Sequence, residues 1–328
     1  MDNGFIEGGL AFLLSLTAVR GMITYTRKHA ILDLPTSRSS HTAPVPRGGG
    51  LGLLCGFLFV SAVQIMRFGP ATALFPLAAA CLVGGIGWLD DRRGLSVRAR
   101  FIVHVGAGLT LGVYAHRLGF SVLWSAWWVF CAVSAINVVN FLDGIDGFVA
   151  SQCLVLCGTL VILAPAGSLG FGLACILGGA LVGFLCWNWP PAKIFMGDVG
   201  SGALGYLCVL IGAVVMSETD ASLVRVFLPL VPMVLDSTWT MLRRQRNGER
   251  LTEAHRSHLY QRLANGGWTH RSVTILYSGA AAGGALVAVV HTSRWWMVAA
   301  SYVAGVIGAG AVLDRTRPFV WTRPVARG

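Results

Sequence analysis

The chain has 328 residues, of which 55% are hydrophobic and only 12% charged, with a formal net charge of +11. Soluble domains carry about 25% charged residues, so this composition excludes an ordinary soluble protein. Repeated apolar runs of about 17–25 residues, the length needed to cross a bilayer, indicate instead an all-α, polytopic integral membrane protein.

Eleven apolar runs follow one another along the chain, and each predicts a membrane-spanning helix. Short polar or Gly/Pro turns separate several of them, as at residues 68–70 and 165–168. The first run has acidic residues before it and basic residues after it, which predicts a first span rather than a cleaved signal peptide. We expect one membrane domain over residues 1–328, with spans at residues 5–26, 50–66, 71–89, 101–116, 121–139, 148–165, 169–187, 201–217, 222–241, 273–291 and 295–313.

The basic residues predict the orientation of these spans. Twenty of the twenty-five Lys and Arg residues fall in segments on one side, namely 27–49, 90–100, 140–147, 188–200, 242–272 and the tail after 313. The positive-inside rule makes this side cytoplasmic, so the N-terminus is predicted to be periplasmic and the C-terminus cytoplasmic. Topogenesis, anionic lipid headgroups and an anionic substrate each explain the positive charge, so no nucleic-acid partner is expected.

Five aspartates lie at the predicted cytoplasmic ends of spans: Asp90, Asp91, Asp143, Asp146 and Asp198. A carboxylate at a membrane boundary is unfavourable unless it is paired, metal-bound or hydrated, so each is a candidate functional residue. Carboxylates that meet on one face repel one another, and a divalent cation with Arg or Lys partners would relieve this repulsion. Magnesium suits oxygen ligands and usually bridges carboxylates to phosphates.

Each motif also has a simpler interpretation when it is taken alone. Residues 90–93 could be a helix end with paired charges, and the two Asp-Gly pairs of residues 140–147 are ordinary turn chemistry. The Gly-rich residues 195–202 could let backbone N–H groups approach a phosphate or simply form a turn. Residues 255–258 could be a solvated helical face, and the loop 33–50 could serve only topogenesis. Because all five motifs fall on one side, a shared site is the better hypothesis.

Taken in chain order, five segments between residues 33 and 263 resemble the polyprenyl-phosphate N-acetylhexosamine-1-phosphate transferase family. They are DLPTSRSSHTAPVPRGGG, DDRRGLS, NVVNFLDGIDGF, NWPPAKIFMGDVGSG and EAHRSHLYQRL. The family includes the peptidoglycan enzyme phospho-N-acetylmuramoyl-pentapeptide transferase and the enzymes that initiate O-antigen and teichoic acid synthesis. The resemblance implies Mg²⁺-dependent transfer (Mn²⁺ being an alternative) of an N-acetylhexosamine-1-phosphate from a UDP-sugar to undecaprenyl phosphate, with release of UMP.

The resemblance also implies roles for the aspartates. Asp90 matches the residue proposed as the base for the lipid phosphate or, alternatively, as a covalent nucleophile. Asp198 matches the magnesium ligand, with Asp91 as a second ligand or neighbour. Catalytic roles are implied for Asp90, Asp91, Asp143, Asp146 and His258, the last holding the nucleotide end.

Substrate contacts are implied for a further set of polar residues. Phosphate contacts are expected from the first loop and near the diphosphate, and nucleotide or sugar contacts from the remaining motifs. The set is Arg38, His41, Arg47, Asn140, Asn188, Lys193, His255 and Arg256.

The last motif departs from many relatives, because Tyr260 and Gln261 stand where those relatives have further histidines. This resembles the O-antigen-initiating branch more than the peptidoglycan branch, and it leaves GlcNAc, QuiNAc and FucNAc open as the sugar. A multi-pass enzyme of the bacterial inner membrane with a cytoplasmic active site is therefore predicted, and a homodimer is left open. The rival hypotheses are a membrane transporter, whose charges should lie near mid-span, and a catalytically inactive relative.

Overall fold

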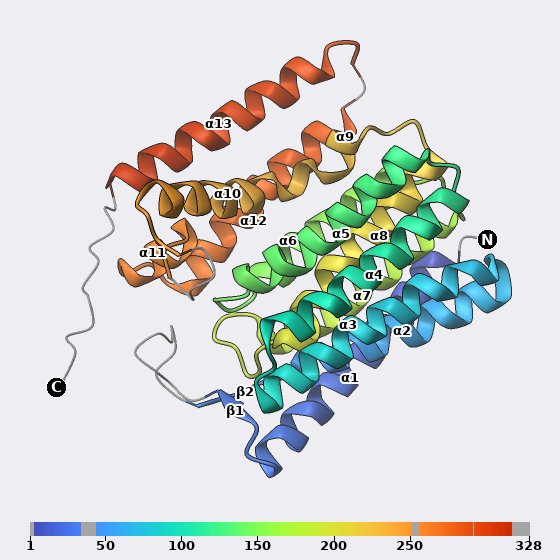
Figure 1. The fold of residues 1–328 in the computed structure, drawn as a ribbon, viewed down its shortest axis with the longest axis horizontal. Helices are drawn as coiled ribbons and strands as arrows, with labels where there is room; N and C mark the ends of the chain where they lie inside the picture. The colour runs from blue at the N-terminus through green and yellow to red at the C-terminus, as the bar shows by residue number, and fades with distance from the viewer. Residues whose placement is uncertain (1–2, 34–43, 251–255, 291, 317–328) are drawn as a thin grey trace.

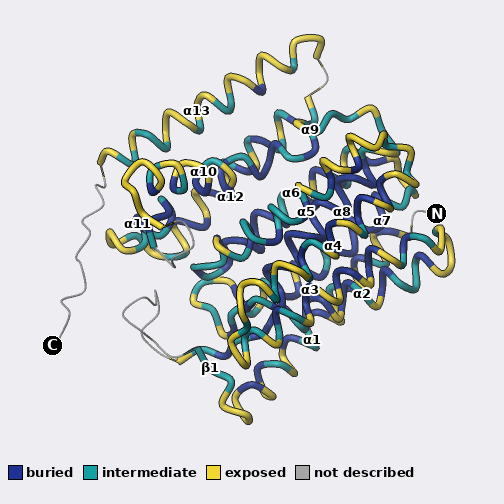
Figure 2. Tube along the Cα trace, in the orientation of Figure 1, coloured by how far each residue is buried: buried dark blue, intermediate teal, exposed yellow. Residues whose placement is uncertain are grey.

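The computed structural model describes residues 3–33, 44–250, 256–290 and 292–316. Long helices run side by side in one bundle, with α1 and α2 at one edge and α13 at the other (Figure 1). The core lies around α7 and α8, and α8 is almost wholly buried, whereas nearly all of α13 is exposed or intermediate (Figure 2). The prediction of an all-α polytopic membrane protein is confirmed.

The helices, in chain order, are α1 (Gly4–Lys28), α2 (Gly49–Phe68), the 3-10 turn η1 (Ala71–Ala73), α3 (Leu74–Arg93), α4 (Val97–Arg117), α5 (Val122–Leu142), α6 (Phe148–Leu163), α7 (Leu169–Asn188), α8 (Asp198–Glu218), α9 (Leu223–Phe227), the 3-10 turn η2 (Leu228–Leu230), α10 (Val231–Arg246), α11 (Leu259–Asn265), α12 (His270–Val289) and α13 (Trp295–Thr316).

Ten of the eleven predicted spans each fall on one helix of the structure, and the span 222–241 falls on α9, η2 and α10. Within the described part of the chain, nine helical segments are long and apolar enough to cross a membrane. The two remaining predicted spans correspond to α6, which is shorter, and to α4, whose first turn carries Arg98 and Arg100. The total of eleven spans and their direction stay predictions.

The predicted span 222–241 is not one continuous helix. It is divided into α9, η2 and α10, with Pro229 inside the 3-10 turn and Pro232 in the first turn of α10. A proline has no N–H to donate and its ring crowds the preceding turn, so two prolines so close together interrupt the regular helix. After this break, α10 leads into the predicted cytoplasmic segment 242–272, which contains the short helix α11.

A short strand pair also lies in the segment expected to be only a polar loop. β1 (Leu32–Asp33) pairs antiparallel with β2 (Val45–Pro46), and Arg47 then bridges to Phe195. The backbone N–H groups of Gly48 and Gly49 both donate to the Phe195 carbonyl, at 3.1 and 2.9 Å. These bonds hold the end of the first loop against the segment that precedes α8, and so they place Arg47 beside the start of α8.

Candidate active site

Asp91 lies near the end of α3 and caps a different helix. Its two carboxylate oxygens accept hydrogen bonds from the backbone N–H groups of Asp198 and Val199, at 3.1 and 3.2 Å. The first N–H groups of a helix have no partner inside the helix, and a carboxylate is the favoured acceptor because of the helix dipole. The Asp91 side chain is only 1% exposed, and Arg47 lies 2.8 Å from it. Asp91 therefore fixes where α8 begins.

Asp198 is linked by Arg100 to Asp90 and by Arg47 to Asp91. Arg100 lies 2.6 Å from Asp90 and 3.5 Å from Asp198, while Arg47 lies 2.7 Å from Asp198. Asp198 also contacts the Asp90 carboxyl group and the Asn140 side chain. The site thus gathers residues from the first loop and from α3, α4, α5 and α8. Three carboxylates share two guanidinium groups, which leaves an excess of negative charge.

Glycines make this close approach of helices feasible. Gly197 has a φ of +76°, and a Cβ atom there would lie 2.6 Å from an Asp91 oxygen. At Gly87 on α3, a Cβ atom would lie 2.3 Å from the Asp198 carbonyl oxygen. The Gly-rich segment 195–202 was expected either to let the backbone approach a phosphate or to form a turn, and Gly197 within it lets the Asp91 carboxylate of α3 approach the start of α8.

The turn after α5 is tied to the segment before α8 by two polar side chains. Asp146 accepts a hydrogen bond from the Ala192 N–H at 3.0 Å and lies 3.3 Å from the His270 ring nitrogen Nδ1. Asn188 is buried, accepts from the Gly147 N–H at 2.9 Å and donates to the Ile194 carbonyl at 2.9 Å. Both side chains hold two loops together beside the carboxylates, which is a structural function in addition to the substrate contact that was predicted for Asn188.

Asp143 is the carboxyl group in this turn whose protonation is most altered. Burial raises the pKa of Asp143 to about 7, against the opposing charge of Arg47 and with the support of the nearby carboxylates of Asp198, Asp91 and Asp146. Burial alone would lower the pKa of the Arg47 guanidinium, but Asp91, Asp198 and Asp143 outweigh it and the pKa is raised. Without a cation, the loop therefore holds a carboxyl group that is partly protonated at neutral pH.

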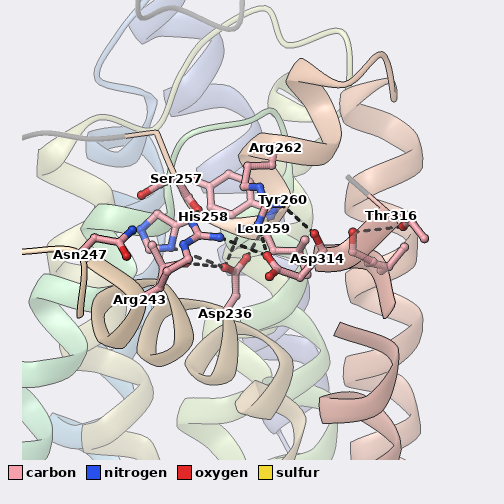
Figure 3. Close-up of polar contacts among 12 residues, drawn as sticks. Asp236, Arg243, Asn247, Ser257, His258, Leu259, Tyr260, Arg262, Asp314 and Thr316 are labelled. Atoms are coloured by element: carbon pink, nitrogen blue, oxygen red, sulfur yellow. Dashed lines mark hydrogen bonds and ion pairs between the residues drawn. The ribbon is translucent and has the colours of Figure 1, made fainter. Parts of the chain in front are cut away.

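A second polar cluster surrounds Asp236 on α10 (Figure 3). Asp236 accepts hydrogen bonds from the Leu259 and Tyr260 N–H groups, at 2.7 and 3.1 Å, and from the Tyr277 hydroxyl at 2.7 Å. The first two bonds cap α11, and the His258 ring nitrogen Nδ1 lies 3.7 Å from the Asp236 carboxylate. His258 is only 1% exposed and its ring stacks on Tyr260.

Tyr260 connects the two clusters. Its ring stacks on Phe148, with centroids 4.5 Å apart, and its hydroxyl donates to the Phe141 carbonyl at 3.5 Å. Gly144 is also close, since a Cβ atom there would lie within contact distance of the Tyr260 hydroxyl. The residue that replaces a family histidine thus packs α11 against the turn that holds Asp143.

The other predicted contact residues are not all brought to the carboxylates. The Lys193 ammonium lies 5.2 Å from the centroid of the Trp187 ring, and Arg256 is half-buried beside the His258 cluster. Arg38, His41 and His255 lie outside the described residues. The structure therefore unites Asp90, Asp91, Asp198, Arg47 and Asn140 in one group and places His258 in a neighbouring one.

Comparisons with known proteins identify the family of the chain. The sequence model described as glycosyl transferase family 4 matches residues 73–217, the segment that runs from α3 to α8. A probable undecaprenyl-phosphate N-acetylglucosaminyl 1-phosphate transferase of Bacillus subtilis is 29% identical over 84% of this chain and 83% of its own length. A decaprenyl-phosphate N-acetylglucosaminephosphotransferase of Mycobacterium tuberculosis is 30% identical, over 83% of this chain and 80% of its own.

A phospho-N-acetylmuramoyl-pentapeptide-transferase of Streptococcus suis is also 30% identical, over 69% of this chain and 81% of its own. The chain belongs to glycosyl transferase family 4. The predicted family is thereby confirmed. The family 4 match contains Asp90, Asp91 and Asp198, whereas Asp236 and His258 lie beyond its end.

The fit of the family 4 site to a divalent cation follows from its donor atoms. Among the described residues, no three His, Cys, Asp or Glu side chains form a group that could hold a metal ion by themselves. The contact between the Asp90 and Asp198 carboxyl groups nevertheless needs a proton, a cation or the Arg100 guanidinium group that pairs with both. These oxygen donors suit Mg²⁺, which is typically held by one or two carboxylates together with water and substrate phosphates. Asp198, the predicted ligand, would hold it together with Asp90, whereas both oxygens of Asp91, the predicted second ligand or neighbour, accept N–H groups at the start of α8.

Two residues of these clusters were missed in the sequence. Arg100 was counted only among the basic residues of its loop, although its position four residues after Ser96, the N-cap of α4, places it on the first turn of that helix. Asp236 was overlooked inside an apolar span, where a carboxylate is itself a signal of function or of a buried partner. Neither signal identifies the partner, because Asp198, which pairs with Arg100, and the Leu259 N–H, which donates to Asp236, are both distant in the sequence.

Proposed function

We propose that this family 4 protein transfers an N-acetylhexosamine-1-phosphate from a UDP-sugar to undecaprenyl phosphate and releases UMP. The observation that carries the proposal is the group of three carboxylates in which Arg100 links Asp90 to Asp198 and Arg47 links Asp91 to Asp198. Carboxylates that can hold a divalent cation lie there beside guanidinium groups that can bind phosphates. The relatives whose names state a polyprenyl phosphate and an N-acetylglucosamine phosphate make GlcNAc the first sugar to test, with QuiNAc and FucNAc as the alternatives.

In the proposed reaction, an oxygen of the lipid phosphate attacks the β-phosphorus of the UDP-sugar. A new P–O bond forms to this oxygen, and the bond from the β-phosphorus to the oxygen shared with the α-phosphate breaks, so UMP leaves with the electron pair. A bound Mg²⁺ would supply electrostatic neutralisation of the phosphates. Arg47 and Arg100 would bind phosphate oxygens and keep the two anions in line. A phosphate monoester is largely ionised at neutral pH, so Asp90 contributes little as a base, and its main role would be to hold Arg100 and the cation.

The proposed location is a bacterial inner membrane with the site on the cytoplasmic face. The carboxylates lie at the last turn of α3 and the first residue of α8, not at the middle of either helix. The basic loops that predict a cytoplasmic side are connected to the same helix ends. This placement supports an enzyme that acts at the membrane surface more than a transporter, whose polar residues should lie near the bilayer midplane.

The test is UMP release by purified protein with undecaprenyl phosphate, Mg²⁺ and a panel of UDP-N-acetylhexosamines, with EDTA as a control. We expect release that requires both the lipid and the cation, for one sugar of the panel. Asp198→Asn and Asp90→Asn should abolish turnover, whereas Asp220→Asn, which changes a carboxylate in the turn after α8, should retain it. Normal turnover in Asp198→Asn, or release that is indifferent to undecaprenyl phosphate, would overturn the proposal.

A further inference from the structure

One side chain joins the last helix, α13, to the second polar cluster. Asp314 is the acidic residue of α13 and lies near the end of this helix. Its carboxylate lies 3.1 Å from a guanidinium nitrogen of Arg243 on α10 and forms a second ion pair with Arg262 on α11. Arg262 also donates to the Asp314 backbone carbonyl at 3.1 Å. Asp314 therefore connects three helices at one point (Figure 3).

The two arginines that pair with Asp314 hold the chain on both sides of His258. The Arg243 guanidinium donates to the backbone carbonyl of Ser257, the residue directly before His258. Arg262 lies one helical turn after His258, and its backbone N–H donates to the His258 carbonyl at 3.0 Å. The contacts of these two arginines with one carboxylate therefore fix the segment that carries His258.

The charges explain why the carboxylate matters at this point. The Arg262 side chain is only 5% exposed, and the positive charge of Arg262 acts on the neighbouring Arg243. Two guanidinium groups brought together away from water repel each other, and a carboxylate that contacts both offsets this repulsion. Loss of the Asp314 charge would therefore drive Arg243 and Arg262 apart, and with them the two flanks of the segment.

The rest of α13 adds little to the core of the bundle. Of the α13 residues, all of which the structure describes, only Ala299 is buried, and it belongs to a small apolar cluster with Leu228 and Ala288. Asp314 lies about four helical turns further along α13. A change at Asp314 therefore acts on α11 and on the end of α10 rather than on the apolar core.

α11 also contacts the turn that holds Asp143, because the Tyr260 hydroxyl donates to the Phe141 carbonyl. We propose that Asp314 is a positioning residue for the nucleotide end of the UDP-sugar: through the two arginines it holds the His258 segment in place beside this turn. This role rests on the proposed function and on the nucleotide contact that is predicted for His258. Asp314 acts through these neighbours and does not itself contact the substrate.

The probe is UMP, the nucleotide product of the proposed reaction, and its dissociation constant is measured by isothermal titration calorimetry on the purified full-length protein with Mg²⁺. Asp314→Asn removes the charge at almost the same size, whereas Asp314→Glu keeps it. Arg315→Gln is the matched control, because this exposed residue is the next one on the same helix. Arg243→Lys keeps a positive charge but has one nitrogen in place of the two that contact Asp314 and Ser257. Asp314→Asn and Arg243→Lys are each also combined with His258→Ala.

We expect Asp314→Asn and Arg243→Lys each to bind UMP about tenfold more weakly, with Asp314→Glu and Arg315→Gln close to the wild type. In the protein that already carries His258→Ala, neither change should weaken UMP binding further, because both act through that residue; a general loosening of the fold would weaken it equally in both backgrounds. Two variants are used so that poor folding of one leaves the other informative.

An unchanged UMP affinity in Asp314→Asn, or equal losses with and without His258→Ala, would overturn the positioning role. These results differ from a failure of the proposed function, in which the wild type itself would neither bind UMP nor release it.

Discussion

Asp91→Asn should destabilise the protein, whereas Asp90→Asn should chiefly affect catalysis, although the two residues are adjacent. Both Asp91 oxygens accept backbone N–H groups at the start of α8. An asparagine has one acceptor oxygen, so its NH₂ group would face the other N–H. Loss of a helix cap costs about 1 kcal/mol, and a buried N–H without a partner costs about 1–3 kcal/mol more. We therefore expect a loss of about 2–4 kcal/mol in the free energy of unfolding.

Asp90→Asn keeps an oxygen for the Leu95 N–H, to which it is bonded at 2.5 Å, and it touches no N–H of α8. Its expected loss of stability is below about 1 kcal/mol. The assay is unfolding in mixed micelles by titration with sodium dodecyl sulfate, followed by tryptophan fluorescence, with UMP release measured in parallel. Equal unfolding free energies for the wild type and Asp91→Asn would refute the capping role and make Asp91 a purely functional residue.

Three further outcomes are expected. The concentration of Mg²⁺ that gives half-maximal activity should rise several-fold as the pH falls from 8 to 6. The reason is that Asp143, with its pKa raised to about 7, then binds a proton in competition with the cation. A half-maximal Mg²⁺ concentration that stays constant with pH would show that protonation of Asp143 does not affect cation binding. Asp236→Ala should expose the segment around α11 to limited proteolysis, because it removes a buried carboxylate that accepts three hydrogen bonds. Such a loss costs about 3–5 kcal/mol of folding free energy, and an unchanged cleavage pattern would contradict this prediction. Asn188→Ala removes two buried hydrogen bonds and should cost about 2 kcal/mol in thermal-unfolding experiments, and a fully stable variant would favour a substrate contact instead.

Much of the fold can be predicted from this sequence because a bilayer imposes a local rule. A helix must satisfy its own backbone in lipid, so a span is visible as an uninterrupted apolar run. All eleven predicted spans accordingly fall on helices. The internal division of residues 222–241 could have been anticipated from Pro229 and Pro232, whereas the β1–β2 pair gave no periodic signal because each strand has only two residues.

The motifs of the candidate site were also visible in the sequence, because carboxylates are rare next to apolar spans. Their partners were not visible. Asp91 caps a helix that begins 107 residues later, and Arg100 reaches Asp198 across 98 residues. Composition and periodicity report on neighbours along one helix, and they carry no information on which helix ends meet. Thus the sequence by itself determined the membrane class, the helices and the candidate residues, while only the packing of α3, α4 and α8 decided that Asp91 is a cap and that Arg100 links Asp90 to Asp198.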